Sequence, residues 1–265
     1  MRASASPGPT TTVSESLRLY ALTGIPLIEP GDDIAAPIVA AAERVAGGVQ
    51  EGDLLVVAQK IVSRSENRYA DLREVMPSAE AERLAPLADK DPRLVEVILR
   101  ESVAVLRQRP GALIVEHKLG YVHANAGVDR SNVADPDRVL LLPEDPDASA
   151  RALRERLREL CGATVSVIIN DSAGRAWRNG ITGFTIGCAG FRPVVNRIGH
   201  PDLFGRLLEM TEVAVADELA AAASFLMGQA DEGIPAVLVR GARLEPSEEG
   251  MRALIRDPAR DLFRR

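Results

Sequence analysis

An acid and a hydroxyl directly follow an apolar run in the second half of the chain. The run from Val165 to Ile169 predicts a buried strand, and Asn170, Asp171 and Ser172 come next. Magnesium and manganese bind carboxylate and hydroxyl oxygens and keep open positions for phosphate. Asp171 and Ser172, at the expected end of this strand, are therefore candidate metal ligands. In the alternative interpretation, Asp171 only pairs with an arginine and caps a helix.

Two arginines lie just beyond this acid, on either side of the chain's one tryptophan. Arg175 and Arg178 are three positions apart, so a helical turn would place both side chains on one side. Guanidinium groups suit phosphate and carboxylate oxygens because they can donate two parallel hydrogen bonds. A helix cap would not require two such cations beside an acid, so their presence favours an anion site.

A second acidic segment is "AGVDRSN" at 126–132, which follows an expected hairpin. Asp129 is a candidate ligand of a hard metal ion, and Asn132 is a candidate polar contact to a bound molecule. A plain turn, in which both side chains bond their own backbone, accounts for the same residues.

A basic segment follows the expected strand at 54–57. Lys60, Arg64 and Arg68 are spaced by four, with Ser63 among them. Basic groups at a strand end could bind phosphate. A solvated helical face explains the spacing equally well.

A long alanine-rich segment contains further candidates. Asp217 and Glu218 lie within the expected helix and are interpreted either as functional acids or as a solvated or helix-pairing acid pair. The glycine-flanked loop 227–233 offers Gln229, Asp231 and Glu232 as ligand groups. Small polar residues are also typical of an ordinary helix-to-strand connection.

Taken together, these groups supply oxygen ligands for a hard metal and cations for anionic oxygens. The sequence contains no Walker-type phosphate loop, no His-Glu-x-x-His and no Gly-x-Ser-x-Gly motif. The combination suits phosphoryl transfer, in which positioning and charge neutralisation provide most of the catalysis.

Helices and strands are expected to alternate, with several strands paired as hairpins. This pattern predicts a mixed α/β (α+β) protein whose mixed, partly antiparallel sheet carries flanking helices. The fully apolar run at 54–57 favours a strand covered on both faces. Helices are expected at 35–46, 78–107, 149–162 and 207–228, a hairpin at 112–127, and further β structure at 163–171, 183–194 and 234–241.

Composition indicates an ordinary globular protein of 265 residues, with 46% hydrophobic and 26% charged residues. A net charge of −6 argues against a general nucleic-acid binder. No apolar run approaches the length of a membrane span, and the two cysteines, Cys161 and Cys188, are expected to be reduced packing residues of a cytoplasmic protein. Residues 1–16 are expected to be a disordered tail, 17–245 the folded domain and 246–265 a helical appendix.

Five motifs, in this order, resemble the F420-0:L-glutamate ligase family, the γ-glutamyl ligases of deazaflavin biosynthesis. They are "GIPLIEPGDD", "GDLLVVAQKIVSR", "NAGVDRSN", "NDSAGRAWRNG" and "TEVAVADELAAAASFLMGQADEGIPAVLVRG". The resemblance covers roughly Leu19 to Gly241 and points to the stand-alone form of the family.

The resemblance implies a homodimeric, GTP-dependent ligase with the γ-glutamyl ligase fold. It would add L-glutamate to the side-chain carboxylate of coenzyme F420-0 through an acyl phosphate, and then extend the product through γ-linkages. Mg²⁺ or Mn²⁺ is expected, up to two ions per site, and the resemblance leaves room for a monovalent cation. No nucleic-acid or membrane partner is expected.

Matched residue by residue, the family's metal ligands correspond to Asp129, Asp171, Ser172 and Gln229. The positions that match its GTP site are Ile25, Pro26, Leu27, Ile28, Gln59, Lys60, Arg64, Asn132, Met227, Gly228, Ala230, Asp231, Glu232, Gly233 and Ile234. Our own inference adds Arg175 and Arg178 to Asp171 as catalytic residues that would face the anionic substrate or the acyl phosphate.

Three positions depart from the family pattern. Arg64 stands where lysine is expected, Ser172 replaces a more usual threonine, and Gln229 replaces a glutamate found in some members. Two rivals stay open: a ligase of the same fold that uses another amino acid or acceptor, and a deazaflavin- or nucleotide-binding protein without catalysis. The carboxylates at 129 and 171 and the hydroxyl at 172 favour an enzyme.

Overall fold

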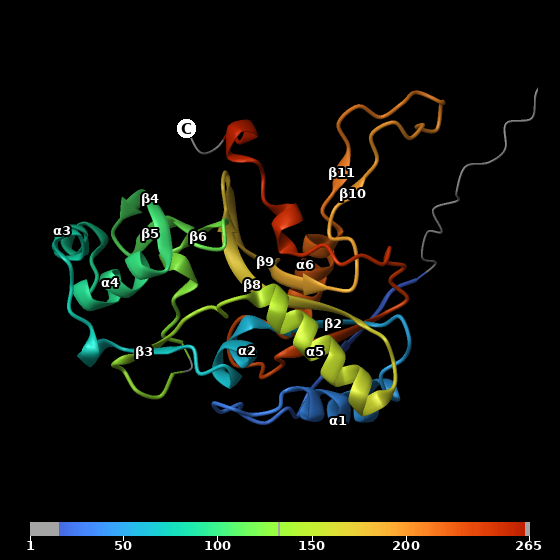
Figure 1. Ribbon diagram of the computed structural model, residues 1–265, viewed down its shortest axis with the longest axis horizontal. Coiled ribbons are helices and arrows are strands. Elements are labelled where there is room, and N and C mark those ends of the chain that lie inside the picture. The colour runs from blue at the N-terminus through green and yellow to red at the C-terminus, as the bar shows by residue number, and fades with distance from the viewer. Residues whose placement is uncertain (1–15, 132, 263–265) are drawn as a thin grey trace, which may run out of the picture.

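A five-stranded mixed sheet forms the centre of the larger part of the molecule (Figure 1). The computed structural model describes residues 16–131 and 133–262, so the expected N-terminal tail, apart from Ser16, and Asn132 lie outside the described residues. The strand order is β1-β12-β2-β8-β9, in which only β2 and β8 run parallel. The expectation of a mixed, partly antiparallel sheet with flanking helices is confirmed. These strands are β1 (Arg18–Ala21), β2 (Leu54–Ala58), β8 (Ser166–Arg175), β9 (Arg178–Ala189) and β12 (Ala236–Arg240).

Helices cover both faces of this sheet because its central strands are apolar on both sides. Leu55 and Val57 pack with α1 (Ala35–Ala46) and α5 (Pro146–Cys161), whereas Leu54 and Val56 pack with α6 (Val215–Met227). Successive side chains of a strand point to opposite faces, so the apolar run at 54–57 serves both layers, as its composition predicted.

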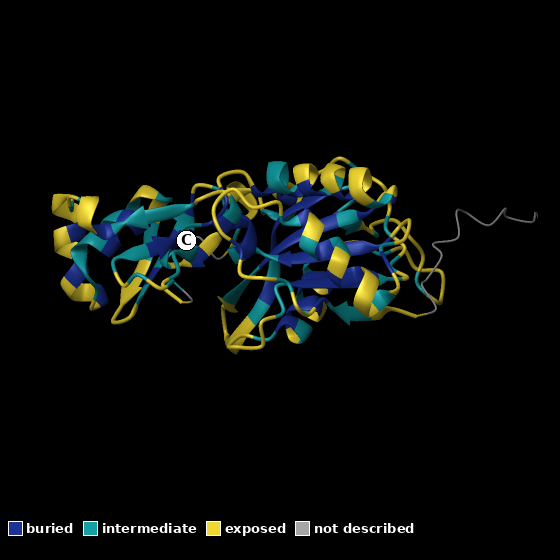
Figure 2. Cartoon of the chain, turned by 90° about the horizontal axis from the view of Figure 1, so that it is seen from below, coloured by how far each residue is buried: buried dark blue, intermediate teal, exposed yellow. Residues whose placement is uncertain are grey.

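A second, smaller lobe lies beside the main sheet (Figures 1 and 2). It has its own buried cluster, in which Leu84, Ile98 and Leu113 are at most 1% exposed. The lobe consists of α3 (Ala79–Ala88), α4 (Pro92–Arg100) and the antiparallel strands β4 (Ser102–Arg109), β5 (Ala112–His117) and β6 (Val122–Ala124). The short helix α2 (Gln59–Ser65) and the paired strands β3 (Tyr69–Asp71) and β7 (Arg138–Leu140) lie along the connection between the lobe and the main sheet.

A narrow arm projects from the main sheet between β9 and α6 (Figure 1). Its base is the pair β10 (Val195–Asn196) and β11 (Glu212–Val213). Several apolar side chains of the arm are exposed, including Leu203 at 98% and Phe204 at 87%.

Some expected elements are confirmed and others are wrong. The helix at 35–46 and the hairpin at 112–127 are present. Residues 102–107, expected to be helical, form β4, because β5 provides a pairing partner for their β-branched side chains. The alanine-rich helix begins at Val215 rather than near 207, since the preceding residues belong to the arm.

Up to residue 262, where the described part of the chain ends, the expected helical appendix forms two short 3-10 turns, Met251–Leu254 and Pro258–Arg260, instead of a longer helix. Met251 is 5% exposed and belongs to the main core, so this region packs against the domain. Within 16–131 and 133–262, none of the helices combines the length and apolar character that crossing a membrane requires.

Candidate active site

A cavity of about 570 Å³ opens at the edge of the main sheet where β2 ends. A volume of this size is typical of small-molecule sites. Four segments that are distant in sequence form its wall: the loop before α1, the β2–α2 junction, part of β8, and the end of α6 with the following loop. The lining residues are Ile25–Ile28, Ala58–Ile61, Arg64, Asn170–Ser172, Ser224 and Met227–Pro235. All residues expected at the GTP site line this cavity except Asn132, which the structure does not describe.

The cationic part of the cavity comes from α2. This segment was expected to be either a basic loop or a helical face, and it is a helix that begins directly after β2. Lys60 is partly exposed toward the cavity, and Arg64, one turn later, is 7% exposed. Arg68 does not line the cavity; its side chain donates to the Leu142 carbonyl oxygen.

The side chain of Glu232 holds the conformation of the loop after α6, to which it belongs. Glu232 accepts a hydrogen bond from the Ala230 backbone N–H at 2.8 Å. Backbone N–H groups of the loop lower the pKa of Glu232, so its side chain is ionised at neutral pH. Its carboxylate lies over Gly228, whose φ of +72° suits glycine. The N–H groups of the loop thus already bind one carboxylate, which shows that they can bind an anion.

Asp171 and Ser172 lie in the interior of a long strand, and the expectation that the strand ends there is wrong. Strand β8 continues to Arg175 because β9 pairs with it along its whole length. A register shift between Ile169 and Asn170 directly precedes the acid. Such irregularities re-aim side chains and are frequent beside active sites.

A histidine from the small lobe reaches Asp171. His123 Nε2 lies 3.1 Å from Asp171 Oδ2, and His123 Nδ1 lies 2.8 Å from the Ala124 carbonyl oxygen. Burial lowers the pKa of His123, but the hydrogen bond and charge of Asp171 outweigh this and raise the pKa overall. Sequence reasoning missed His123, because the three histidines do not cluster in sequence and only the fold brings this one to the acid.

His123 belongs to a cluster of four rings, of which three are buried and Phe184 is partly buried. Tyr121 stacks on His117 at 5.2 Å between ring centroids, and Phe184 contacts both Tyr121 and His123 at 5.7 and 5.6 Å. Burial, followed by the charge of Asp171, raises the pKa of Tyr121. Burial lowers the pKa of His117 to about 4, so its imidazole is neutral at physiological pH.

Asp129 does not line the cavity, but it contacts Lys60, which does. Its Oδ2 is 2.8 Å from Lys60 Nζ and 2.9 Å from the Ser131 hydroxyl, and its Oδ1 accepts from the Ser131 N–H. Backbone hydrogen bonds with Leu140 in both directions hold Asp129 against β7.

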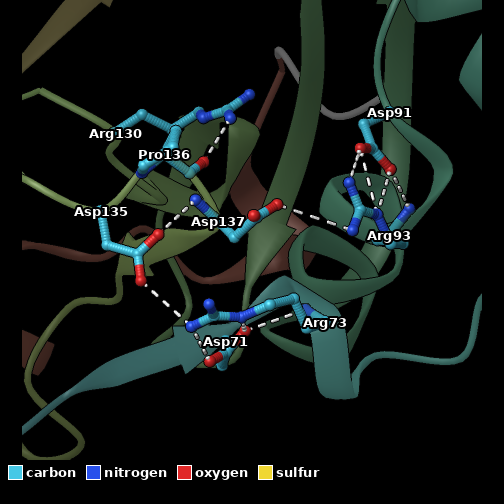
Figure 3. Close-up of polar contacts among 8 residues, drawn as sticks. All are labelled: Asp71, Arg73, Asp91, Arg93, Arg130, Asp135, Pro136 and Asp137. Atoms are coloured by element: carbon cyan, nitrogen blue, oxygen red, sulfur yellow. Dashed lines mark hydrogen bonds and ion pairs between the residues drawn. The ribbon is translucent and has the colours of Figure 1, made fainter.

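Polar contacts of Arg130 and of residues 135–137, which follow Asp129 in sequence, tie this part of the chain to the turn after β3 and to α4 (Figure 3). Asp135 pairs with Arg73 at 3.0 Å, and Asp137 lies 3.7 Å from Arg93. Arg130 donates to the Pro136 carbonyl oxygen at 2.7 Å. Each exposed pair contributes at most about 1 kcal/mol, but together they restrict the loop that carries the candidate ligand.

The expected metal ligands have suitable chemistry for a hard divalent ion. Asp171 keeps Oδ1 without a hydrogen-bond partner among the described residues, and Gln229 donates its amide N–H to Ser224, which leaves its amide oxygen as a donor to a cation. Lys60 must move if Asp129 is to bind a metal. Within the described chain, no three acidic, histidine or cysteine side chains cluster as a metal site. Mg²⁺ commonly takes only one or two carboxylates from a protein together with phosphate oxygens, and the chemistry of these side chains is compatible with that mode.

Arg175 and Arg178 do not share a helical turn, so that expectation is wrong. They are the last and first residues of β8 and β9 and pair with each other at the tip of the hairpin, next to the exposed Trp177. Neither lines the cavity. Four strand positions separate Arg175 from Asp171, which is about 13 Å. The catalytic role of Arg175 and Arg178 stays a prediction. Their distance from Asp171 within one chain does not favour it.

Asp217 occupies a structural position in the first turn of α6 rather than mid-helix. Its carboxylate accepts from the Thr185 backbone N–H at 2.9 Å. Burial raises the pKa of Asp217. Neither Asp217 nor Glu218 lines the cavity. The buried Cys188 and the partly buried Cys161 are both free thiols, as expected.

Comparison with known proteins points to a single family. The family model for F420-0:gamma-glutamyl ligase matches residues 24–241. The coenzyme F420:L-glutamate ligase of Methanopyrus kandleri is 50% identical over 241 residues, which are 89% of this chain and 93% of that protein.

Two further relatives carry the same name. The enzyme of Methanothermobacter thermautotrophicus is 45% identical, over 94% of this chain and 99% of its own. That of Archaeoglobus fulgidus is 43% identical, over 94% and 97%. The family-model match covers the small lobe, every segment that lines the cavity and the main sheet apart from β1. The chain therefore belongs to the F420-0:gamma-glutamyl ligase family.

Proposed function

We propose that this protein ligates L-glutamate to the side-chain carboxylate of coenzyme F420-0 and then extends the product through γ-linkages. The observation that carries the proposal is the cavity at the end of β2. It combines Lys60 and Arg64 with an N–H-bearing loop and with Asp171 and Ser172, in a chain whose relatives are named for this ligation.

GTP is the proposed energy source. Ile25–Ile28 would form the apolar wall for the base, and Lys60, Arg64 and the loop 228–233 would hold the phosphates. A carboxylate oxygen of F420-0 attacks the γ-phosphorus and GDP leaves, which gives an acyl phosphate. The glutamate amine then attacks the acyl carbon. The C–N bond forms as inorganic phosphate leaves, and the amine loses its proton.

Mg²⁺ or Mn²⁺ would be held by Asp129, Asp171, Ser172 and Gln229 and would neutralise phosphate charge. The residues of the chain then contribute orientation: Lys60 and Arg64 fix the nucleotide, and the N–H groups of the loop after α6 bind its anionic oxygens. This division agrees with the general requirement of phosphoryl transfer for positioning and charge neutralisation.

A homodimer is the proposed assembly. The projecting arm exposes Leu203, Phe204, Leu207 and Met210, each at 64% or more. Exposed apolar groups of this kind are typical of interaction surfaces. In a dimer, Arg175 and Arg178 at the tip of the β8–β9 hairpin could approach the partner's substrate. A cytoplasmic location is proposed as well, and the two free thiols support it.

Mass spectrometry of F420-0 incubated with the protein, L-glutamate, GTP and Mn²⁺ tests the proposed function. The acceptor mass should rise in steps of one glutamate residue, and a parallel sample with ATP reports nucleotide preference. Asp171→Asn should abolish the product and keep the fold. No mass increase with folded, metal-loaded protein would refute the activity and would favour another acceptor or a binding protein without turnover.

A further inference from the structure

We propose that His123 is a positioning residue that fixes the Asp171 carboxylate and sets its separation from Asp129. The inference rests on the proposed function, because it takes both acids as metal ligands. The two acids come from different parts of the fold: Asp171 from the main sheet and Asp129 from the segment that follows β6 in the small lobe. A contact between these parts is needed to hold the two carboxylates in one site.

The first step of the argument is the hydrogen bond itself. His123 is 8% exposed, the Asp171 side chain is 14% exposed, and Nε2 approaches only Oδ2 of the carboxylate. The imidazole therefore occupies one carboxylate oxygen and leaves the other for a cation. Partners that orient ligating carboxylates in this way fix geometry that the ligand alone does not have.

The second step is that the ring of His123 cannot easily turn away. Phe184 lies directly opposite Asp171 in the β8–β9 register and packs against the imidazole. Tyr121 contacts the imidazole edge-on, with centroids 6.2 Å apart, and also packs against Phe184, so the three rings contact one another. Nδ1 is held at the Ala124 carbonyl oxygen. Ring packing and the hydrogen bond at Nδ1 therefore hold the His123 imidazole in place, with Nε2 directed at Asp171.

The third step connects His123 to Asp129. Only five residues separate them, and Asn125, Ala126 and Gly127 all have positive φ. This tight turn is fixed by the Asn125 side chain, which accepts the Leu113 N–H at 3.0 Å. Leu142 packs so closely over Gly127 that a Cβ there would lie 2.7 Å from it. His123 and Asp129 thus move as one unit, and the bond to Asp171 places that unit on the main sheet.

Substitutions at 123 separate positioning from packing. His123→Phe keeps a ring without a donor, whereas His123→Gln places an amide N–H near the position of Nε2. His117→Phe is the matched control, because it changes a buried histidine of the same ring cluster that does not contact Asp171. Asp171→Asn tests the metal site itself.

The measurement is Mn²⁺ affinity, followed from the electron paramagnetic resonance signal of the free ion, with thermal unfolding in parallel. His123→Phe should bind Mn²⁺ about 10- to 100-fold more weakly, and His123→Gln should recover most of the affinity. His117→Phe should bind as the wild type does. In turnover, the Mn²⁺ concentration for half-maximal rate should rise in His123→Phe, while kcat at saturating Mn²⁺ is retained.

Two results would overturn the inference. The first is equal affinity in His123→Phe and His117→Phe, and the second is a loss in His123→Gln as large as in His123→Phe. If His123→Phe does not fold, His123→Asn replaces it, because its amide reaches only the position of Nδ1. Wild-type affinity in Asp171→Asn would instead refute the proposed metal site, and the positioning role would fall with it.

Discussion

Gly183 provides the sharpest test of how α6 is seated on the main sheet. An added Cβ would lie 2.4 Å from Ser224 Cβ, 2.7 Å from the Ala220 carbonyl oxygen and 2.7 Å from Asn170 Oδ1. Its φ lies outside the left-handed region, so alanine is allowed by the backbone and Gly183→Ala is a purely steric change. Because Ala220 contributes a backbone atom, a side-chain rotation cannot relieve the contact, and α6 must shift by about 1 Å.

The expected stability loss for Gly183→Ala is about 1–3 kcal/mol, as for other overpacked sites. The effect on function should be larger, because α6 leads into the loop 228–233 and Gly183 pairs directly with Ser172. A displacement of about 1 Å in a site can lower turnover about 100-fold.

Gly174→Ala is the matched control for this experiment. Gly174 lies in the same hairpin, also without a positive φ, and its added Cβ would meet nothing within 4 Å. Urea unfolding and GTP-dependent ligation should be measured for both variants and the wild type. Gly174→Ala should stay within about 0.5 kcal/mol of the wild type. Equal stability and turnover in the two variants would show that α6 does not press on β9 as the structure has it.

Three further predictions concern a buried base, a buried ion pair and the loop after α6. The pKa of His117 is about 4 in the folded protein and 6.5 for the free side chain, so protonation favours the unfolded chain. The free energy of unfolding should therefore fall by about 2 kcal/mol from pH 7 to pH 5. His117→Asn, which keeps an acceptor for the Leu119 N–H, should lose this part of the pH dependence in urea titrations, and equal slopes would contradict the prediction. Asp53→Ala should lower the free energy of unfolding by about 3 kcal/mol, because it leaves the Arg240 guanidinium without its carboxylate partner at 2.8 Å. The GTP affinity of the folded protein, measured by calorimetry, should not change, since Asp53 precedes β2 at the end away from the cavity. Glu232→Gln should raise GTP affinity about three- to tenfold, because it removes a negative charge that already holds loop N–H groups; weaker binding in calorimetry would show that Glu232 serves the nucleotide instead.

Part of the cavity wall could be predicted from residue types alone. The basic segment after β2 and the glycine-flanked polar loop after α6 carry side chains that indicate phosphate or metal binding. Ile25–Ile28, by contrast, were expected there only from the resemblance to the family. Asp171 and Ser172 were recognised from their residue types as well, although the strand was expected to end at them. That error arose because a polar residue in a strand does not end it when a neighbouring strand, here β9, continues to pair with it.

The structure of Ser102–Arg109 illustrates the same limit. Residues 102–107 continue a helical region in sequence, and only pairing with β5 makes them a strand. The positions of Arg175 and Arg178 also depend on pairing, because three positions apart means one face in a helix but opposite sides of a turn in a hairpin.

By itself, the sequence determined most of the regular elements, the mixed α/β class and the residue types of the basic and polar segments, since periodicity and turn chemistry act over a few positions. Tertiary structure alone decided which distant groups meet. His123 and Asp171 are 48 positions apart and bond at 3.1 Å, and Lys60 reaches Asp129 across the two lobes. Such contacts depend on how separate elements pack, and packing is a property of the whole chain that no local pattern encodes.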